Sequence, residues 1–134
     1  MHEIVVGALV RDDRVLLVHR SPDRRAFPNV WDLPGGHIEP SESELEALAR
    51  ELHEELAVRI ETGSASHLCR LDLGRGDDEV SLSAWLVGDW RGTPTNTAPD
   101  EHDEIAWFRP DEIPPLAHGH LATVLVSALH DLRA

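Results

Sequence analysis

Apolar and polar residues follow one another along the chain in patterns that predict several strands. Residues 4–10 and 15–20 are two apolar runs separated by the polar segment 11–14, which is typical of two strands joined by a turn. Residues 80–87 alternate with a period of two, so that every second side chain belongs to one apolar face of a strand. A shorter apolar segment at 105–108 predicts a further strand.

Between these strands the apolar spacing changes to that of a helix. Leucine and alanine side chains recur three or four residues apart and form a core stripe at Leu45, Leu48, Ala49, Leu52 and Leu56. Ser41 and Glu44 have the spacing of a capping box at the start of this helix, where Glu42 adds negative charge. Residues 116–132 have the spacing of a closing helix. This order of segments predicts an α/β (α+β) fold in which helices cover a mixed sheet.

The composition excludes several classes of protein. The chain has 134 residues and a formal net charge of −13, which argues against a polymeric nucleic-acid partner. All of its basic residues are arginines, so lysine-based phosphate loops and Schiff-base mechanisms are excluded. The single cysteine, Cys69, is expected to be a small strand hydrophobe. No apolar run is long enough to cross a bilayer and no signal segment opens the chain, which predicts one cytoplasmic domain, residues 1–134, without a membrane partner.

Several carboxylates lie on the predicted helix, on the side away from its leucines. Glu54 and Glu55 follow Glu51 by three and four residues, which places their Cβ atoms about 5–6 Å from that of Glu51. Carboxylates packed this closely repel one another unless a cation lies among them, and their hard oxygens suit Mg²⁺ or Mn²⁺. Arg50 can pair with one of them and fix its direction. The alternative interpretation of the three glutamates alone is a solvated acidic helix face.

The surroundings of these glutamates resemble a known signature. Gly36, then Glu42 after five residues, then Arg50 to Val58 after seven more, resemble the Nudix box, which here spans residues 36–58. The chain is therefore identified as similar to the Nudix hydrolase superfamily, in particular its MutT-like members, and the resemblance implies the Nudix-type α/β/α sandwich. Ala57 departs from the family pattern, which has glycine at this helix end, where a left-handed residue is often favoured. Alanine in that conformation costs about 1 kcal/mol.

The resemblance implies an enzyme that uses Mg²⁺, or Mn²⁺ in its place, to hydrolyse a phosphoanhydride bond. The catalytic residues that it implies are Arg50, Glu51, Glu54 and Glu55, and the metal ligands are Gly36, Glu51, Glu54 and Glu55. A further metal ligand is expected from the acidic segment 100–104, and Glu104 is the choice because family members often carry a glutamate shortly before a tryptophan, here Trp107. Which carboxylate takes the proton of the attacking water stays open.

Residues outside the box are assigned to the substrate. Arg20, which ends a predicted strand, and Arg25, in the loop that follows, are expected to contact phosphate. Phe27 and Trp85 are candidates for stacking on a base, with core packing as the alternative for each. The expected partner is a small nucleotide, and the protein is expected to be a monomer or a homodimer.

Three functions remain open at this point. The short chain and the loop that contains Asn96 favour a MutT-like enzyme that cleaves a nucleoside or deoxynucleoside triphosphate to monophosphate and pyrophosphate. A partly matching signature before the box indicates the alternative, hydrolysis of coenzyme A or another nucleotide derivative. The third function is that of a non-catalytic domain that senses a nucleotide, but such domains typically lose box carboxylates that are all present here.

Overall fold

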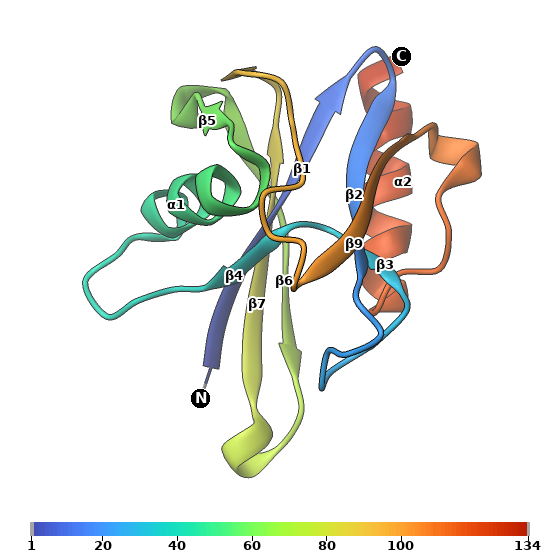
Figure 1. Ribbon diagram of the computed structural model, residues 1–134. Coiled ribbons are helices and arrows are strands. Elements are labelled where there is room, and N and C mark those ends of the chain that lie inside the picture. Colours follow the sequence, from blue (N-terminus) through green and yellow to red (C-terminus); the bar gives the residue numbers. More distant parts are fainter. Residues whose placement is uncertain (1, 134) are drawn as a thin grey trace.

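The computed structural model describes residues 2–133. Its helices and strands (Figure 1) are β1 (His2–Arg11), β2 (Arg14–Arg20), β3 (Trp31–Asp32), β4 (Gly35–His37), α1 (Glu44–Leu56), β5 (Arg59–Ile60), β6 (Ala65–Leu73), β7 (Val80–Val87), β8 (Trp90–Arg91), β9 (His102–Phe108) and α2 (Gly119–Arg133). Within the described range, neither helix has the length and apolar character that crossing a membrane requires.

One mixed sheet of seven strands forms the centre of the fold. β1 lies in its middle, parallel to β7 on one side and antiparallel to β2 and β4 on the other. The strand order along the main path is β3-β2-β1-β7-β6, and β9 pairs with the free edge of β2. β5 and β8 form a separate two-stranded sheet. Parallel and antiparallel pairs therefore occur together, as predicted.

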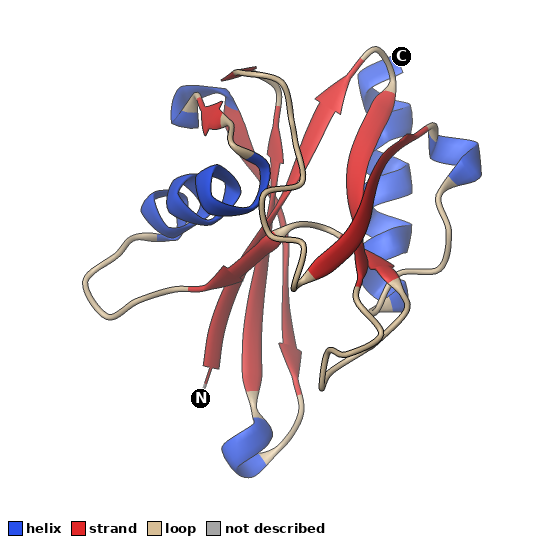
Figure 2. Cartoon of the chain, viewed as in Figure 1, coloured by secondary structure: helices blue, strands red, loops and turns tan. Residues whose placement is uncertain are grey.

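The two helices cover opposite faces of this sheet (Figure 2). Val5 and Leu9 of β1 belong to a core formed with α1, whereas Val6 and Ala8 belong to a second core formed with α2. Successive side chains of a strand point to opposite faces, so this alternation along β1 places one helix on each side. The predicted α/β/α sandwich is therefore confirmed.

The helix that carries the box, α1, begins two residues later than the predicted capping box implies. Ser43 is its N-cap: the hydroxyl of Ser43 accepts from the backbone N–H of Glu46 at 3.1 Å, and the Glu46 carboxylate accepts from the backbone N–H of Ser43 at 2.8 Å. Ser41 and Glu44 have the same spacing, but the chain is still turning at Glu42, whose N–H donates to a carbonyl three residues earlier. Glu42 therefore precedes the helix, and its placement in the first turn was wrong.

The end of α1 confirms the expected left-handed residue. Ala57 has φ 58° and ψ 30°, and its backbone N–H donates to the carbonyl of His53 at 3.0 Å. An alanine thus adopts the conformation in which its Cβ approaches the carbonyl oxygen that follows it, at an energetic cost that glycine would avoid.

Two further boundaries differ from the prediction. β9 begins at His102, three residues before the apolar segment, because polar residues continue the ladder with β2 as far as Arg20. α2 begins at Gly119 and not at residue 116, because Leu116 is extended and forms a bridge with Trp31. Apolar periodicity does not detect either effect, since both depend on pairing with a distant strand.

Candidate active site

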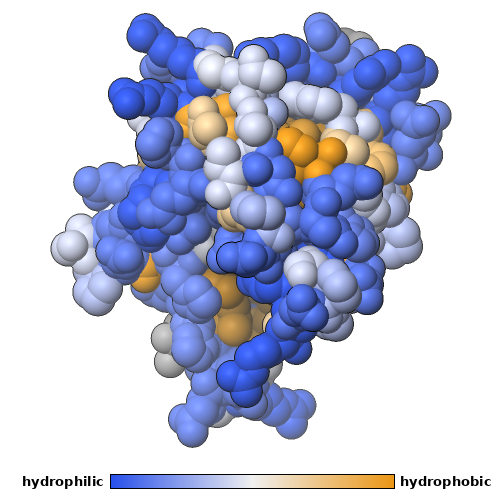
Figure 3. Space-filling view, in the orientation of Figure 1, coloured by the Kyte–Doolittle hydropathy of each residue, from blue (hydrophilic) through white to orange (hydrophobic). Residues whose placement is uncertain are grey.

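A small cavity lies where the end of α1 meets β4 and the segment before β9. Its volume is about 110 Å³. Gly35 and Gly36 line it, together with the charged and titratable residues Arg20, Arg24, His37, Glu51, Glu55, Glu101 and His102. The face of the molecule seen in Figure 3 is mostly hydrophilic, as expected for a chain with 25 acidic residues.

β4 brings glycine backbone against the box helix. Gly36 pairs with Val5 of β1, and a Cβ atom added at Gly36 would lie 2.5 Å from the carboxylate carbon of Glu51. Gly35 has φ +152°, and a Cβ atom there would overlap the carbonyl oxygen of Val5. The two glycines therefore allow the Glu51 carboxylate to rest directly against the strand.

Arg50 binds two carboxylates of the box at once. Its Nε and Nη2 donate to the two oxygens of Glu42 at 2.8 and 2.9 Å, and its Nη1 donates to Glu51 Oε1 at 2.9 Å. Glu54 Oε2 lies 3.6 Å from the same Nη1. The hydrogen bonds from Arg50 lower the pKa of Glu42 to about 2, so Glu42 stays ionised and anchors the guanidinium. The contact with Glu51 fits the expectation that Arg50 pairs with one carboxylate of the box.

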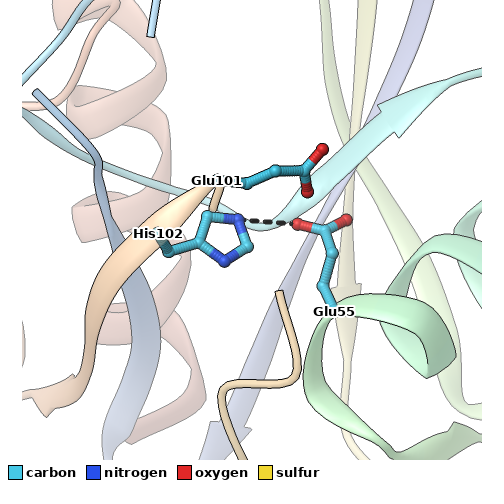
Figure 4. A group of neighbouring side chains, drawn as sticks. All are labelled: Glu55, Glu101 and His102. Atoms are coloured by element: carbon cyan, nitrogen blue, oxygen red, sulfur yellow. Dashed lines mark ion pairs between the residues drawn. The ribbon is translucent and has the colours of Figure 1, made fainter. Parts of the chain in front are cut away.

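Glu55 is buried, with only 2% of its surface exposed. Its Oε1 lies 2.9 Å from Nε2 of His102, which is buried as well (Figure 4). Glu55 Oε2 has no hydrogen-bond partner among the residues that the structure describes. Burial, followed by the nearby carboxylate of Glu51, raises the pKa of Glu55 to about 9, and burial lowers the pKa of His102 to about 4. In this dry environment an ionised Glu55 requires a compensating cation.

Glu101 forms a group of potential ligands with Glu55 and His102. One ligand atom from each side chain lies within 4.8 Å of the other two. Figure 4 shows the three side chains converging from the end of α1 and from the segment that leads into β9. The unpartnered, buried oxygen of Glu55 and the carboxylate of Glu101 fit a divalent cation that prefers oxygen ligands.

Residues 95–102, called the capping loop below, connect this group to the end of α1. Thr97 donates from its backbone N–H to the carbonyl of Glu55 at 2.9 Å and from its hydroxyl to the carbonyl of Glu54 at 2.7 Å. Carbonyls in the last turn of a helix lack partners within the helix, and the loop supplies them here. At its other end, the carbonyl of Glu101 accepts from the backbone N–H of Ser21 at 3.0 Å. The capping loop is thus fixed to α1 and to the loop after β2.

The predicted metal ligands of the box do not share one environment. Gly36, Glu51 and Glu55 line the cavity, whereas the side chain of Glu54 is 58% exposed and does not line it. The alternative interpretation, a solvated acidic helix face, therefore does not describe Glu55, because the capping loop and β4 cover that side of α1. The spacing of the glutamates shows which side chains are neighbours, but it does not show which of them another segment covers.

Glu101, and not Glu104, lies beside Glu55. Glu104 is exposed, stands opposite His19 in the ladder between β2 and β9, and does not line the cavity. The register of this ladder shifts next to His19, so alternation along the acidic segment does not indicate which side chain turns inward. Glu101 belongs to the acidic segment from which a further ligand is expected, although Glu104 is the residue predicted there, and His102 has no predicted role.

Two arginines line the cavity, but only one of them is a predicted substrate residue. Arg20 lines it and also braces the loop after β2, because Nε and Nη2 donate to the carbonyl of Ala26 at 3.0 and 2.8 Å. Arg25 is exposed and does not line the cavity, whereas Arg24, four residues after Arg20, does.

The two predicted stacking residues lie in different parts of the molecule. Phe27 is 47% exposed, and its ring meets the ring of His118 edge to face, with centroids 4.9 Å apart. Trp85 packs against the core formed with α1, and its Nε1 donates to Glu44 at 2.9 Å. The alternative of core packing therefore describes Trp85, while Phe27 presents an aromatic surface to solvent.

Comparisons with known proteins identify the family of the chain. The model of the NUDIX domain matches residues 1–126. CTP pyrophosphohydrolase of Escherichia coli (strain K12) is 37% identical over 114 residues, which cover 84% of this chain and 78% of that protein. 8-oxo-dGTP diphosphatase of the same organism is 28% identical over 115 residues, covering 84% and 88%.

Solved structures give the same result. The crystal structure of a MutT NUDIX hydrolase from Burkholderia pseudomallei matches with a TM-score of 0.81 and 31% identity, covering 92% of this chain and 95% of that one. The solution structure of the E. coli ORF135 protein matches with a TM-score of 0.79 and 30% identity, covering 100% and 91%. The chain therefore belongs to the NUDIX domain family and is a MutT-like Nudix hydrolase.

Proposed function

We propose that this hydrolase uses Mg²⁺, with Mn²⁺ as a substitute, to cleave a nucleoside or deoxynucleoside triphosphate to monophosphate and pyrophosphate. The observation that carries the proposal is the buried Oε2 of Glu55, which lacks a hydrogen-bond partner within residues 2–133 and belongs to a side chain that lines the cavity with Glu51 and Glu101. A cation there would satisfy this oxygen, and a set of carboxylates favours Mg²⁺. The names of two relatives, CTP pyrophosphohydrolase and 8-oxo-dGTP diphosphatase, support triphosphates as the substrate class.

The proposed cation ligands are the carbonyl of Gly36 and the carboxylates of Glu51, Glu55 and Glu101, which line the cavity, together with the exposed Glu54, whose Oε2 lies 3.6 Å from Nη1 of Arg50. Glu101 takes the role that the sequence analysis gave to Glu104, which does not line the cavity. The chemistry that Mg²⁺ would supply, held by these residues, is neutralisation of the phosphate charge and activation of water. Arg50 keeps the Glu51 carboxylate in one orientation, and a carboxylate of this set accepts the proton of the attacking water.

Two arginines in the cavity and one exposed aromatic ring outside it suit the remainder of a nucleotide. Arg20 and Arg24 supply the positive charge that binds phosphate in an otherwise acidic protein. Phe27, with His118 behind it, offers the base an exposed aromatic surface. The coenzyme A alternative relies on Arg25 as well as Arg20, and Arg25 does not line the cavity, which favours the triphosphate. All of these groups come from one chain, so a monomer is sufficient for the proposed reaction.

The test is a panel of ribo- and deoxyribonucleoside triphosphates, with coenzyme A included, incubated with the protein and Mg²⁺. We expect monophosphate and pyrophosphate from at least one triphosphate, and no product in excess chelator. If coenzyme A were cleaved about tenfold more efficiently, a difference of about 1.4 kcal/mol, the triphosphate assignment would be rejected while the hydrolase chemistry would stand. If no compound were cleaved, the proposed function would be rejected in favour of a nucleotide-sensing domain.

A further inference from the structure

The backbone of His102, whose side chain lines the cavity, is held in place by the capping loop. The side chain of Asn96 closes this loop, because its Nδ2 donates to the carbonyl of His102 at 2.8 Å and its Oδ1 accepts from the N–H of Ala98 at 3.2 Å. The N–H of His102 in turn donates to the carbonyl of Ala98 at 3.0 Å. The loop is itself fixed to the last turn of α1, so the imidazole has a defined position relative to the box helix.

The imidazole of His102 pairs with one carboxylate oxygen of Glu55, and the other oxygen has no such partner among the described residues. His102 Nε2 lies 2.9 Å from Oε1, and side-chain exposure is only 4% for His102 and 3% for Glu55. The two oxygens belong to one planar group, so fixing Oε1 also fixes the direction of Oε2, which has no partner among the described residues. A hydrogen bond between two side chains this deeply buried is not loosened by competing water.

We propose that His102 is a positioning residue for the divalent cation: its Nε2–H holds Oε1 of Glu55, so that Oε2 is presented to the metal, and Asn96 holds His102 in this position. The proposal rests on the function proposed above. While Nε2 donates to Glu55, the remaining potential ligand atom of His102 is Nδ1, which is buried and has no hydrogen-bond partner among the described residues; the variants below distinguish a positioning residue from a ligand. Partners of this kind fix the orientation of ligands in metal sites and contribute to metal affinity.

The experiment measures the binding of Mn²⁺ in the absence of nucleotide. The electron paramagnetic resonance signal of free Mn²⁺ decreases as the ion binds, so its loss on titration with protein gives the affinity. We expect His102→Leu to weaken Mn²⁺ binding by about 10–100-fold. His102→Gln should bind close to the wild-type value, because the glutamine amide can donate from about the position of Nε2. The Mn²⁺ affinity of Asn96→Ala should lie between those of His102→Leu and His102→Gln. Thermal unfolding in chelator establishes that each variant is folded, and His102→Asn replaces His102→Leu if the latter does not fold.

A matched control is provided by His19. Its Nδ1 lies 2.7 Å from Asp103, so it also pairs with a carboxylate, but His19 does not line the cavity. His19→Leu should leave Mn²⁺ affinity unchanged. Excess Mn²⁺ should also restore most of the turnover of His102→Leu, because the carboxylate ligands are intact, and a variant damaged only in its fold would not recover in this way.

Three outcomes distinguish failure of the positioning role of His102 from failure of the proposed function. Unchanged Mn²⁺ affinity in His102→Leu, or in the His102→Asn variant that replaces it, would refute the positioning role. Equal weakening in His102→Leu and His102→Gln would show that the imidazole itself is a ligand, which also refutes the proposal. A wild-type protein that binds no Mn²⁺ at all would reject the proposed function and not merely the role of His102.

Discussion

The carboxylate of Glu51 rests where the side chain of residue 36 would be if that residue were not glycine. A Cβ atom on Gly36 would lie 2.5 Å from the carboxylate carbon of Glu51 and 2.6 Å from its Oε2. The same carboxylate is held from the other side by Nη1 of Arg50 at 2.9 Å. Glu51 is thus confined between a strand and a guanidinium, which is the preorganisation that a metal ligand needs.

Gly36→Ala should therefore reduce activity without unfolding the protein. The added methyl group displaces the end of a flexible side chain and not backbone, so we expect a loss of no more than about 1 kcal/mol in the free energy of unfolding. Glu51 must move away from its position beside Arg50, and we expect turnover to fall by about 10²-fold. Initial rates and thermal unfolding of the same preparation measure the two effects.

Gly63→Ala is the control for this substitution. A Cβ atom at Gly63 meets nothing within 4 Å, so this variant should match the wild type in both measurements. A Gly36→Ala enzyme with wild-type turnover would show that the position of Glu51 is not critical.

The sequence predicted strands β1, β2, β7 and β9, the leucine stripe of α1 and the left-handed Ala57, because these depend on local periodicity and spacing; the short strands β3 and β4 have too few residues to show a period. The start of α1 was placed two residues too early because the serine-to-glutamate spacing occurs twice, and only the turn at Glu42 distinguishes the copies. The burial of Glu55 and its contact with His102 were beyond prediction, since they depend on a loop some 40 residues away along the chain that folds over the end of the helix.

Glu54→Gln should lower turnover by about 10²-fold or more, because it removes one charged oxygen near the developing charge. Glutamate and glutamine have similar helix propensity and the position is exposed, so the unfolding temperature should stay the same. Glu46→Gln, on the same helix, keeps the capping box and should leave turnover unchanged. Wild-type turnover of Glu54→Gln at saturating Mg²⁺ would remove Glu54 from the site.

Ala57→Gly should stabilise the protein. Alanine is strained at φ 58°, and glycine relieves that strain although it also increases the entropy of the unfolded chain. The net gain should be about 0.5–1 kcal/mol, or about 2–4 °C in the unfolding temperature, measured by circular dichroism. Activity should be retained, because Ala57 is exposed and lines no part of the cavity. A lower unfolding temperature would contradict the assignment of strain to this residue.

The pH dependence of stability should weaken in the presence of metal. Without metal, the pKa of Glu55 is about 9 in the folded protein and near its ordinary value of 4.5 in the unfolded chain. The folded protein then holds a proton that the unfolded chain has released, so the contribution of Glu55 to stability is lost as pH rises from about 4.5 to about 9. His102 acts in the opposite direction, because its lowered pKa makes stability fall as pH decreases from 6.5 towards about 4.

The metal-free protein should therefore lose stability between pH 6.5 and pH 9, and excess Mg²⁺ should restore most of it at the alkaline end, where the ionised Glu55 gains its cation. Thermal unfolding in chelator and in Mg²⁺, at several values of pH, measures both effects. Glu55→Gln cannot ionise, so it should show neither the alkaline loss from this group nor the full gain from Mg²⁺. A metal-free wild type that keeps the same unfolding temperature across this range, relative to Glu55→Gln, would show that burial does not hold Glu55 in its protonated form.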